Sequence, residues 1–255
     1  MYKTMFFRPT GIVLFFTLLV MSATATAQSN VRKPTMVIVH GAWGGSWAFK
    51  KVDSILTTRG YTVYRPALTG QGERVHLASP DVGLSVHIND VVNTILFEDL
   101  HDIILVGHSY GGMVITGVAD RLADRIKSLV YLDAMVPNDG ESVMSIQGDR
   151  ANSLKPMIKD GFIVPMWVKE DQKPPKDVPQ SLKTFTEAIS LKNPAARQLS
   201  ARYILTVEAG KDPKSDDFAL HADRAKQRGW PVSQLTADHN PQWSAIMPLV
   251  NALDK

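Results

Sequence analysis

The chain has 255 residues, of which 44% are hydrophobic and 21% charged, enough for one large domain with a sizeable core or two small ones. It contains no cysteine, which excludes disulfide bonds and a lipid-modified cysteine. The formal net charge is +3, and no basic patch with interleaved aromatic residues stands out. We therefore expect no nucleic-acid partner.

The N-terminus has the three parts of a secretory signal peptide. Lys3 and Arg8 precede a largely apolar run over residues 11–21, and Ala25-Thr26-Ala27 follows it. The alternative is a membrane anchor, but a run of 11 residues is too short to cross a bilayer.

We therefore expect residues 1–27 to be a signal peptide and residues 28–255 to be the exported domain. The mature protein would then be periplasmic or secreted, without a stable membrane anchor. Cleavage before Gln28 removes two of the 28 basic residues and none of the 25 acidic ones, which leaves a net charge of +1. Most of the apparent basicity thus belongs to the targeting segment.

Beyond this segment, short β-branched apolar runs alternate with helical patterns, which is typical of βαβ units and a mainly parallel sheet. The predicted strands are 36–39, 61–64, 103–106, 129–132, 203–207 and 232–235. The predicted helices lie near 46–58, 85–97, 112–124, 217–227 and 242–252. The fold class is therefore α/β, with helices flanking the sheet.

One interval, residues 137–200, breaks this alternation because it contains no predicted strand and is too long for a single crossover. Insertions of this kind commonly cover the cleft at the ends of the strands. The interval contains Met144, Phe162, Met166 and Trp167, whose side chains would form an adaptable apolar wall or pack the insertion onto the sheet. Both interpretations stay open.

The stretch "IILVGHSYGGMVITG", residues 103–117, joins a strand directly to a helix. Ser109 lies at the tip of this tight turn, and Gly107 and Gly111 stand two residues to either side of it. This G-x-S-x-G pattern between a strand and a helix is typical of a nucleophile elbow. The sequence therefore predicts that Ser109 is a nucleophile.

A serine nucleophile needs a base within hydrogen-bond reach, and His239 is the best candidate among the seven histidines. It follows the last predicted strand, in "LTADHNPQWS". We expect His76, His101 and His221 in polar or charged, solvated surroundings. His40 ends the first strand, and His108 belongs to the elbow itself.

The glycine-rich stretch "HGAWGG", residues 40–45, directly follows the first strand. Small residues there allow backbone N–H groups to approach a substrate oxygen. The N–H of Tyr110, at the start of the elbow helix, would be a second donor, where the helix dipole also favours negative charge. A dinucleotide site is excluded because G-x-G-x-x-G is absent.

Four stretches, "VHGAWGGSW", "LTGQGERVHL", "ILVGHSYGGMVITGVADR" and "LVYLDAMVP", together resemble the α/β-hydrolase fold. More narrowly, they resemble bacterial carboxylesterases related to the plant methylesterase and hydroxynitrile lyase branch. The resemblance runs from about Thr35 to the final helix. It implies six main strands, a helical cap over about 137–200, and ester hydrolysis without a cofactor through an acyl-serine intermediate. It also implies oxyanion donors at Ala42 and Tyr110.

Two aspartates are candidates for the acid that orients His239. Asp133 ends the fourth strand, and Asp212 follows the fifth in the turn-like stretch "AGKDP". The usual position of the acid in the superfamily favours Asp212, whereas members of the bacterial subgroup often lack an acid in this later loop. An aspartate at an apolar strand end also needs a hydrogen-bond partner. Asp133 is therefore preferred, and Asp212 is the second candidate.

We expect five residues of these motifs and of the cap to contact a small-molecule ester, with apolar or aromatic esters favoured: Trp43, His108, Met135, Met166 and Trp167. No H-E-x-x-H or comparable metal-ligand spacing occurs, so we expect no metal and no cofactor. The sequence indicates neither the natural substrate nor the oligomeric state.

Three other functions compete with ester hydrolysis. The triad pattern does not distinguish esters from lactones, amides or carbon–carbon bonds. The related hydroxynitrile lyases carry a threonine and a lysine where this chain has Gly41 and Asn240, which argues against a lyase. A non-catalytic ligand-binding protein would have no need for Ser109 and His239 in this pattern.

Overall fold

The computed structural model describes residues 1–4 and 33–254. The predicted signal peptide, residues 1–27, therefore lies outside the described residues except for its first four. Contacts divide the chain into two units, Met1–Val31 and Arg32–Lys255. The second unit contains every helix and strand that the structure describes.

The second unit is built on a six-stranded sheet with the strand order β2-β1-β3-β4-β8-β9. All neighbouring strands in it are parallel. The mainly parallel, six-stranded sheet that the sequence predicts is confirmed. The strands are β1 Thr35–Val39, β2 Thr62–Tyr64, β3 Ile103–Ser109, β4 Ile126–Ala134, β8 Ser200–Val207 and β9 Val232–Thr236.

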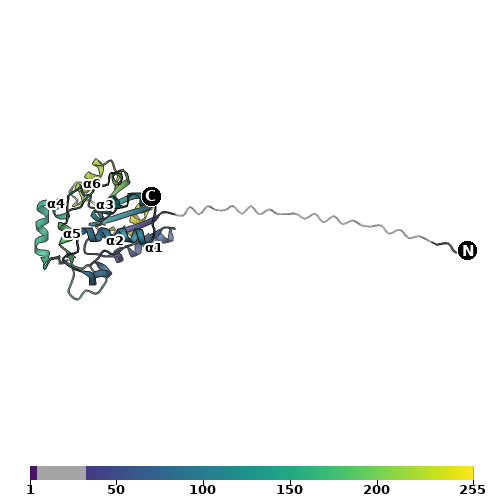
Figure 1. The fold of residues 1–255 in the computed structure, drawn as a ribbon, viewed down its shortest axis with the longest axis horizontal. Coiled ribbons are helices and arrows are strands. Elements are labelled where there is room, and N and C mark those ends of the chain that lie inside the picture. The colour runs from purple at the N-terminus through teal and green to yellow at the C-terminus, as the bar shows by residue number, and fades with distance from the viewer. Residues whose placement is uncertain (5–32, 255) are drawn as a thin grey trace. The chain divides into compact units, whose positions relative to one another are not determined.

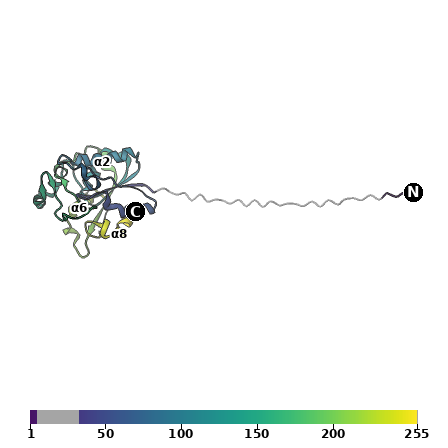
Figure 2. The same cartoon turned by 90° about the horizontal axis from the view of Figure 1, so that it is seen from below.

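Helices cover both faces of the sheet, each over its own apolar cluster. Helices α1 and α8 pack on the face that carries Met36 and Ile38, and helices α2, α3 and α6 pack on the face that carries Leu105 and Tyr131. Figure 1 shows the helices packed around the sheet, and Figure 2 shows α2 and α8 on opposite sides of it. The helices are α1 Lys50–Thr58, α2 Leu84–Phe97, α3 Gly111–Arg121, α6 Ala219–Gln227, α7 Pro241–Ser244 and α8 Ile246–Leu253.

The insertion between β4 and β8 differs from its prediction because it contains strands as well as helices. Strands β5 Ile158–Lys159, β6 Phe162–Ile163 and β7 Gln180–Ser181 form a small antiparallel sheet. Two-residue strands are too short for an alternating pattern to be visible. Asp160-Gly161 is the usual signal for a two-residue hairpin turn, and both residues adopt positive φ.

Helical segments make up the rest of this insertion, which we call the cap. They are α4 Val143–Gln147, α5 Lys183–Thr186 and the 3-10 helices Gly148–Met157 and Pro194–Gln198. Phe185 of α5 is 4% exposed and belongs to the same apolar cluster as α2 and α3. The cap is therefore docked on the core through buried apolar side chains.

Parallel pairing brings the carboxyl ends of the strands to one edge of the sheet. Ser109 is the last residue of β3, and Asp133 is the penultimate residue of β4. His239 follows β9 by three residues. The topology thus brings these three residues, which lie far apart in the sequence, to the same edge.

No helix among the described residues is long and apolar enough to span a bilayer.

Candidate active site

Ser109 occupies a strained turn between β3 and α3. Its φ is 54°, in the left-handed region that non-glycine residues rarely adopt. A Cβ on Gly107 would lie 2.7 Å from the carbonyl oxygen of Gly111, and a Cβ on Gly111 would lie 2.7 Å from that of Val39. Only glycine therefore fits at either position, and the local structure is the predicted elbow.

Asp133 lies at an irregularity in the pairing of β3 with β4, where the register passes from His108↔Leu132 to Ser109↔Ala134. Its φ is 43°, and the residue is 1% exposed. Its Oδ1 atom accepts a hydrogen bond from the Thr206 N–H at 3.0 Å. The bulge turns the carboxylate out of the alternating side-chain pattern of the strand.

His239 links these two residues. Its Nδ1 donates to Asp133 Oδ2 at 2.6 Å, and its Nε2 lies 2.9 Å from Ser109 Oγ, which then donates to it. The imidazole stacks on the Phe218 ring with a centroid distance of 4.6 Å. A serine hydroxyl, an imidazole and a buried carboxylate in this order form the geometry of a catalytic triad.

The second candidate acid, Asp212, lies in a different environment. It is exposed, and its Oδ1 accepts a hydrogen bond from the Lys214 N–H at 3.0 Å as the N-cap of a 3-10 helix. The structure therefore brings Asp133, and not Asp212, to His239. The catalytic role of Asp133 itself stays a prediction.

Two buried histidines tether the loops around Ser109. His108 Nε2 donates to the backbone carbonyl of His239 at 2.7 Å, and its ring lies 4.9 Å from the His239 ring. His40 donates from Nδ1 to the Gly41 carbonyl at 2.8 Å and accepts the Leu68 N–H at 3.2 Å. Burial lowers the pKa of His108 to about 3 and that of His40 to about 4, so both are neutral tethers.

The predicted oxyanion donors lie on either side of Ser109. Ala42 follows β1, and Tyr110 precedes α3. Neither backbone N–H donates a hydrogen bond to another residue of the range 33–254. Both are therefore available to a substrate oxygen, which is the arrangement that an oxyanion hole requires.

A cleft of about 380 Å³ opens above Ser109 and His239. Among the predicted substrate contacts, Trp43, His108 and Trp167 line it. Its lining within the described residues includes one carboxylate, Asp177, and no lysine or arginine. The described lining therefore offers no lysine or arginine side chain to pair with an anionic group.

Two predicted substrate contacts do not reach this cleft. Met135 is 5% exposed and packs in the core beneath the elbow, where its N–H donates to the Ser109 carbonyl at 3.0 Å. Met166 is 69% exposed and does not belong to the cleft lining. Met135 belongs to the "LVYLDAMVP" motif and Met166 to the cap, but membership of a motif or of the cap does not determine side-chain direction.

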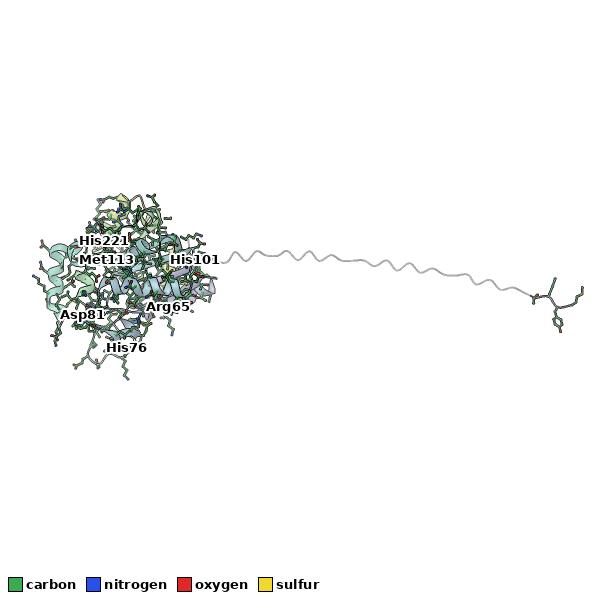
Figure 3. The ribbon with its side chains drawn as sticks, viewed as in Figure 1. Arg65, His76, Asp81, His101, Met113 and His221 are labelled. Carbon is green, nitrogen blue, oxygen red and sulfur yellow. The ribbon has the colours of Figure 1, made fainter. Side chains whose placement is uncertain are left out.

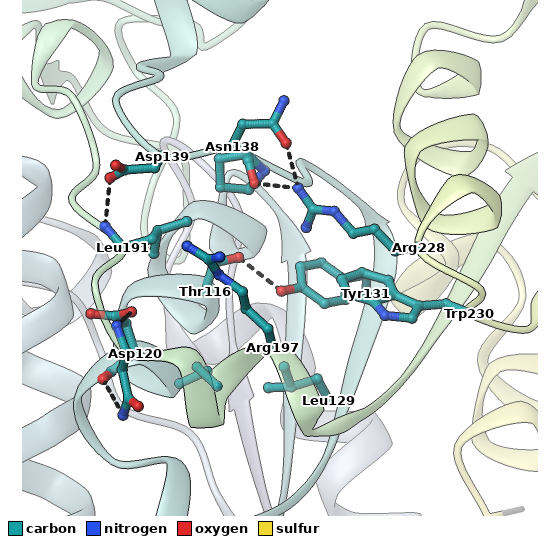
Figure 4. A pocket seen from close by; sticks show the side chains of 14 residues that line it. Thr116, Asp120, Leu129, Tyr131, Asn138, Asp139, Leu191, Arg197, Arg228 and Trp230 are labelled. Atoms are coloured by element: carbon teal, nitrogen blue, oxygen red, sulfur yellow. Dashed lines mark hydrogen bonds between the residues drawn. The ribbon is translucent and has the colours of Figure 1, made fainter.

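Two other cavities lie away from the triad. One of about 440 Å³ lies between α3, β4 and the two ends of the cap, where Tyr131 contacts Thr116 and Arg228 contacts Asn138 (Figure 4). Another of about 940 Å³ lies beside the catalytic cleft and shares Asp177 with its lining. Within the described residues, no cluster of three or more histidine, aspartate or glutamate side chains could hold a metal ion.

Several residues around the triad are not predicted by any sequence motif. Phe218 stacks on His239, Thr206 binds Asp133, and Trp243 lines the cleft. No local pattern distinguishes these residues, because each acts through a contact across the fold. His221 was expected in solvated surroundings and is instead 3% exposed, where its Nδ1 accepts the Val136 N–H.

Comparison with known proteins agrees with this fold. The model of the alpha/beta hydrolase family matches residues 36–250, and the chain therefore belongs to that family. Pheophorbidase from Raphanus sativus is 30% identical over 244 residues, which cover 82% of this chain and 88% of that protein.

A carbendazim hydrolyzing esterase from Nocardioides sp. is 50% identical over 127 residues, or 50% of this chain and 51% of the relative. Methylesterase 2 from Arabidopsis thaliana is 28% identical over 127 residues, or 49% and 48% of the two chains. The chain thus spans about half the length of these two relatives. An extracellular alpha/beta-hydrolase from a Paenibacillus species superposes with a TM-score of 0.72 at 23% identity, covering 87% of this chain and 98% of that chain.

Proposed function

We propose that the protein is a serine carboxylesterase that cleaves neutral carboxylic esters through an acyl-serine intermediate. The observation that carries the proposal is the continuous hydrogen-bond chain from Ser109 through His239 to the buried Asp133. The relatives support it, because the carbendazim hydrolyzing esterase and Methylesterase 2 are both named as esterases.

Acylation follows from these positions. Ser109 Oγ attacks the ester carbonyl while His239 Nε2 takes its proton, and Asp133 stabilises the imidazolium through Nδ1–H. The N–H groups of Ala42 and Tyr110 hold the oxyanion of the tetrahedral intermediate. His239 then returns the proton to the leaving alkoxide, and the alcohol departs.

Deacylation repeats the same steps with water. His239 takes a proton from water, the hydroxide attacks the acyl carbonyl, and the same two N–H groups hold the second oxyanion. The proton returns from His239 to Ser109 Oγ, which releases the carboxylic acid and regenerates the hydroxyl. This cycle involves only the side chains and backbone donors already described.

The cleft supports a preference for apolar or aromatic esters. The indoles of Trp43 and Trp167 meet edge to face with ring centroids 5.2 Å apart, and Trp243 completes the apolar lining. Asp177 adds a carboxylate, which would repel an anionic acyl or alcohol group. The same triad is compatible with lactone or amide cleavage, whereas the neutral side chain of Asn240 offers no cation for a lyase.

The test is the time course of p-nitrophenyl acetate hydrolysis by wild type and by Ser109→Ala. We expect a burst of nitrophenol equal to the enzyme concentration in the wild type, and a loss of turnover by several orders of magnitude in the variant. A folded Ser109→Ala variant with unchanged turnover would refute the proposal.

The preference for neutral esters is tested separately. We expect kcat/KM to be higher for neutral aryl esters than for esters that carry two negative charges. The reverse order would contradict the role that we assign to Asp177.

A further inference from the structure

Trp43, the residue after the predicted oxyanion donor Ala42, is bound by the cap at three points. Its N–H donates to Gln180 Oε1 at 2.8 Å, its carbonyl accepts the Val178 N–H at 2.8 Å, and its indole N–H donates to the Ile163 carbonyl at 3.0 Å. The φ of Trp43 is 61°, a strained conformation that needs external support. All three partners belong to the cap, so the cap supports this conformation.

Gln180 is the only side chain among these partners, and it is itself fixed. It is completely buried, and its Nε2 donates to Thr184 Oγ1 at 2.8 Å. The Thr184 hydroxyl in turn donates to the Ser181 carbonyl at 2.7 Å, which leaves the threonine oxygen free to accept from Gln180. This order determines the amide orientation, with the Gln180 oxygen facing Trp43.

The second predicted oxyanion residue, Tyr110, also touches the cap. Its ring stacks on Phe185 with a centroid distance of 5.8 Å and an interplanar angle of 4°. Phe185 also packs on the Trp43 ring at 5.6 Å. The Tyr110 hydroxyl donates to His87 Nδ1 at 3.0 Å, because His87 Nε2 already donates to the Thr69 carbonyl at 2.9 Å.

We propose that Gln180 is a positioning residue that, together with Phe185, holds the oxyanion loop in place, so that the oxyanion hole is complete only when the cap is docked. The inference rests on the proposed function, because it concerns the donors of the same site. Gln180 does not line the cleft that contains Ser109 and therefore acts through Trp43. Its loss would reduce stabilisation of the transition state and leave ground-state binding unchanged.

The experiment compares Gln180→Leu, Gln180→Glu and, as a matched control, Gln172→Leu. Leucine removes both hydrogen bonds of Gln180, whereas glutamate keeps an oxygen that accepts from the Trp43 N–H. Gln172 is an exposed glutamine of the cap. The measurements are the rate at which a fluorophosphonate labels Ser109, kcat and KM for p-nitrophenyl acetate, and the thermal unfolding midpoint.

We expect Gln180→Leu to reduce the labelling rate and kcat by about 10- to 100-fold, somewhat less than the removal of an oxyanion donor, with KM changed by less than about twofold. Gln180→Glu should recover most of this loss, and Gln172→Leu should behave as wild type. Thr184→Val, which removes the acceptor of Gln180 Nε2, should show a smaller loss in the same direction. It replaces Gln180→Leu where that variant does not fold.

A Gln180→Leu protein that folds and labels as fast as wild type would overturn the inference. An increase in KM at unchanged kcat would also overturn it, because that result indicates substrate contact. A wild-type protein that reacts with the fluorophosphonate but hydrolyses no ester would instead refute the proposed function. The two failures are thus distinguishable.

Discussion

Asp133 illustrates how a buried charge is made tolerable at the scale of one residue. A carboxylate that is 1% exposed is expensive unless hydrogen bonds replace its water. The Thr206 N–H and the His239 Nδ1–H supply two such bonds, one to each oxygen. The hydrogen bond between His239 and Asp133 therefore orients the imidazole and also compensates the buried carboxylate for its lost water.

This interaction leads to a paired prediction for Asp133→Asn and Asp212→Asn. The side-chain amide that Asp133→Asn introduces would donate to His239 Nδ1 and favour the tautomer with a proton on Nε2, which cannot accept the Ser109 proton. We expect kcat to fall by about 10⁴-fold, as for a triad histidine in the wrong tautomer. Asp212→Asn should change kcat less than about threefold, because Asp212 only caps an exposed turn.

Steady-state kinetics on purified variants, with thermal unfolding as a control for folding, decide between the two aspartates. An inactive, folded Asp212→Asn next to an active Asp133→Asn would reverse the assignment.

The sequence predicts a site residue well when a local motif marks it, and poorly when its role depends on contacts between distant segments. Ser109 sits in a local pattern of five residues, and His239 follows from chain order after the last strand. The preference between Asp133 and Asp212 needed a resemblance, because both follow strands that end at the same edge. Gln180 and Phe218 carry no local signal, since their roles arise from contacts between distant segments.

At the scale of elements, the elbow depends on close backbone contact between β3 and α3. A Cβ on Gly107 would lie 2.7 Å from the Gly111 oxygen and 2.9 Å from Ile115 Cδ1. A Cβ on Gly44 would meet its first neighbour only at 3.8 Å, an ordinary contact. The two glycines therefore differ in the space that an added Cβ would have.

We expect Gly107→Ala to destabilise the protein by about 1–3 kcal/mol through overpacking, and Gly44→Ala to be close to neutral. For a chain of this size, each kcal/mol lowers the unfolding midpoint by about 2–4 °C. Differential scanning calorimetry of both variants provides the measurement. Equal midpoints for Gly107→Ala and wild type would mean that the elbow relaxes without strain.

The alternating strands and helices of the core were predictable because most of them, unlike the three-residue β2 and the four-residue α7, are long enough to show their hydrophobic pattern. The cap was predicted only in outline. Its strands have two residues each, and its helices α4 and α5 have five and four. The "DG" pair at 160–161 was the one local signal for the hairpin between β5 and β6, and it is too short to predict strands by itself.

At the scale of the whole molecule, the predicted export remains a proposal, because most of residues 1–27 lie outside the described part. We expect the exported protein to begin at Gln28, after the Ala25-Thr26-Ala27 pattern. Intact mass and N-terminal sequencing of protein from the periplasm or medium provide the measurement. Membrane-bound protein that still carries Met1 would contradict export and favour an anchor.

Buried histidines also determine how the whole fold responds to acid. Burial lowers the pKa of His40 and His221 to about 4 each and that of His108 to about 3, and the neighbouring Arg224 contributes to the shift of His221. His76 and His101 are instead exposed (Figure 3). A fourth buried histidine, His87, whose pKa burial also lowers, hydrogen-bonds to Tyr110. His40 and His108 line the catalytic cleft, whereas His221 does not, so a substitution of His221 tests stability without altering the cleft.

Proton linkage determines whether the stability of the fold rises or falls with pH. The unfolded chain binds a proton on His221 near pH 6.5, whereas the folded chain binds one only near pH 4. The stabilisation from the neutral histidine is therefore fully present above about pH 6.5 and is lost as the pH falls toward 4. Its size is on the order of 3 kcal/mol, since each pKa unit corresponds to about 1.4 kcal/mol.

We expect His221→Gln to flatten this acid dependence. The glutamine oxygen can accept the Val136 N–H, as His221 Nδ1 does at 3.0 Å, but it does not titrate. Urea unfolding between pH 4 and 7.5 should show a slope against pH that is smaller by up to about 1.4 kcal/mol per unit than in wild type. His76→Gln, at an exposed position, should keep the wild-type slope. Equal slopes in His221→Gln and wild type would show that His221 takes up its proton without unfolding, and acid sensitivity would then arise at the other buried histidines, His40, His87 and His108.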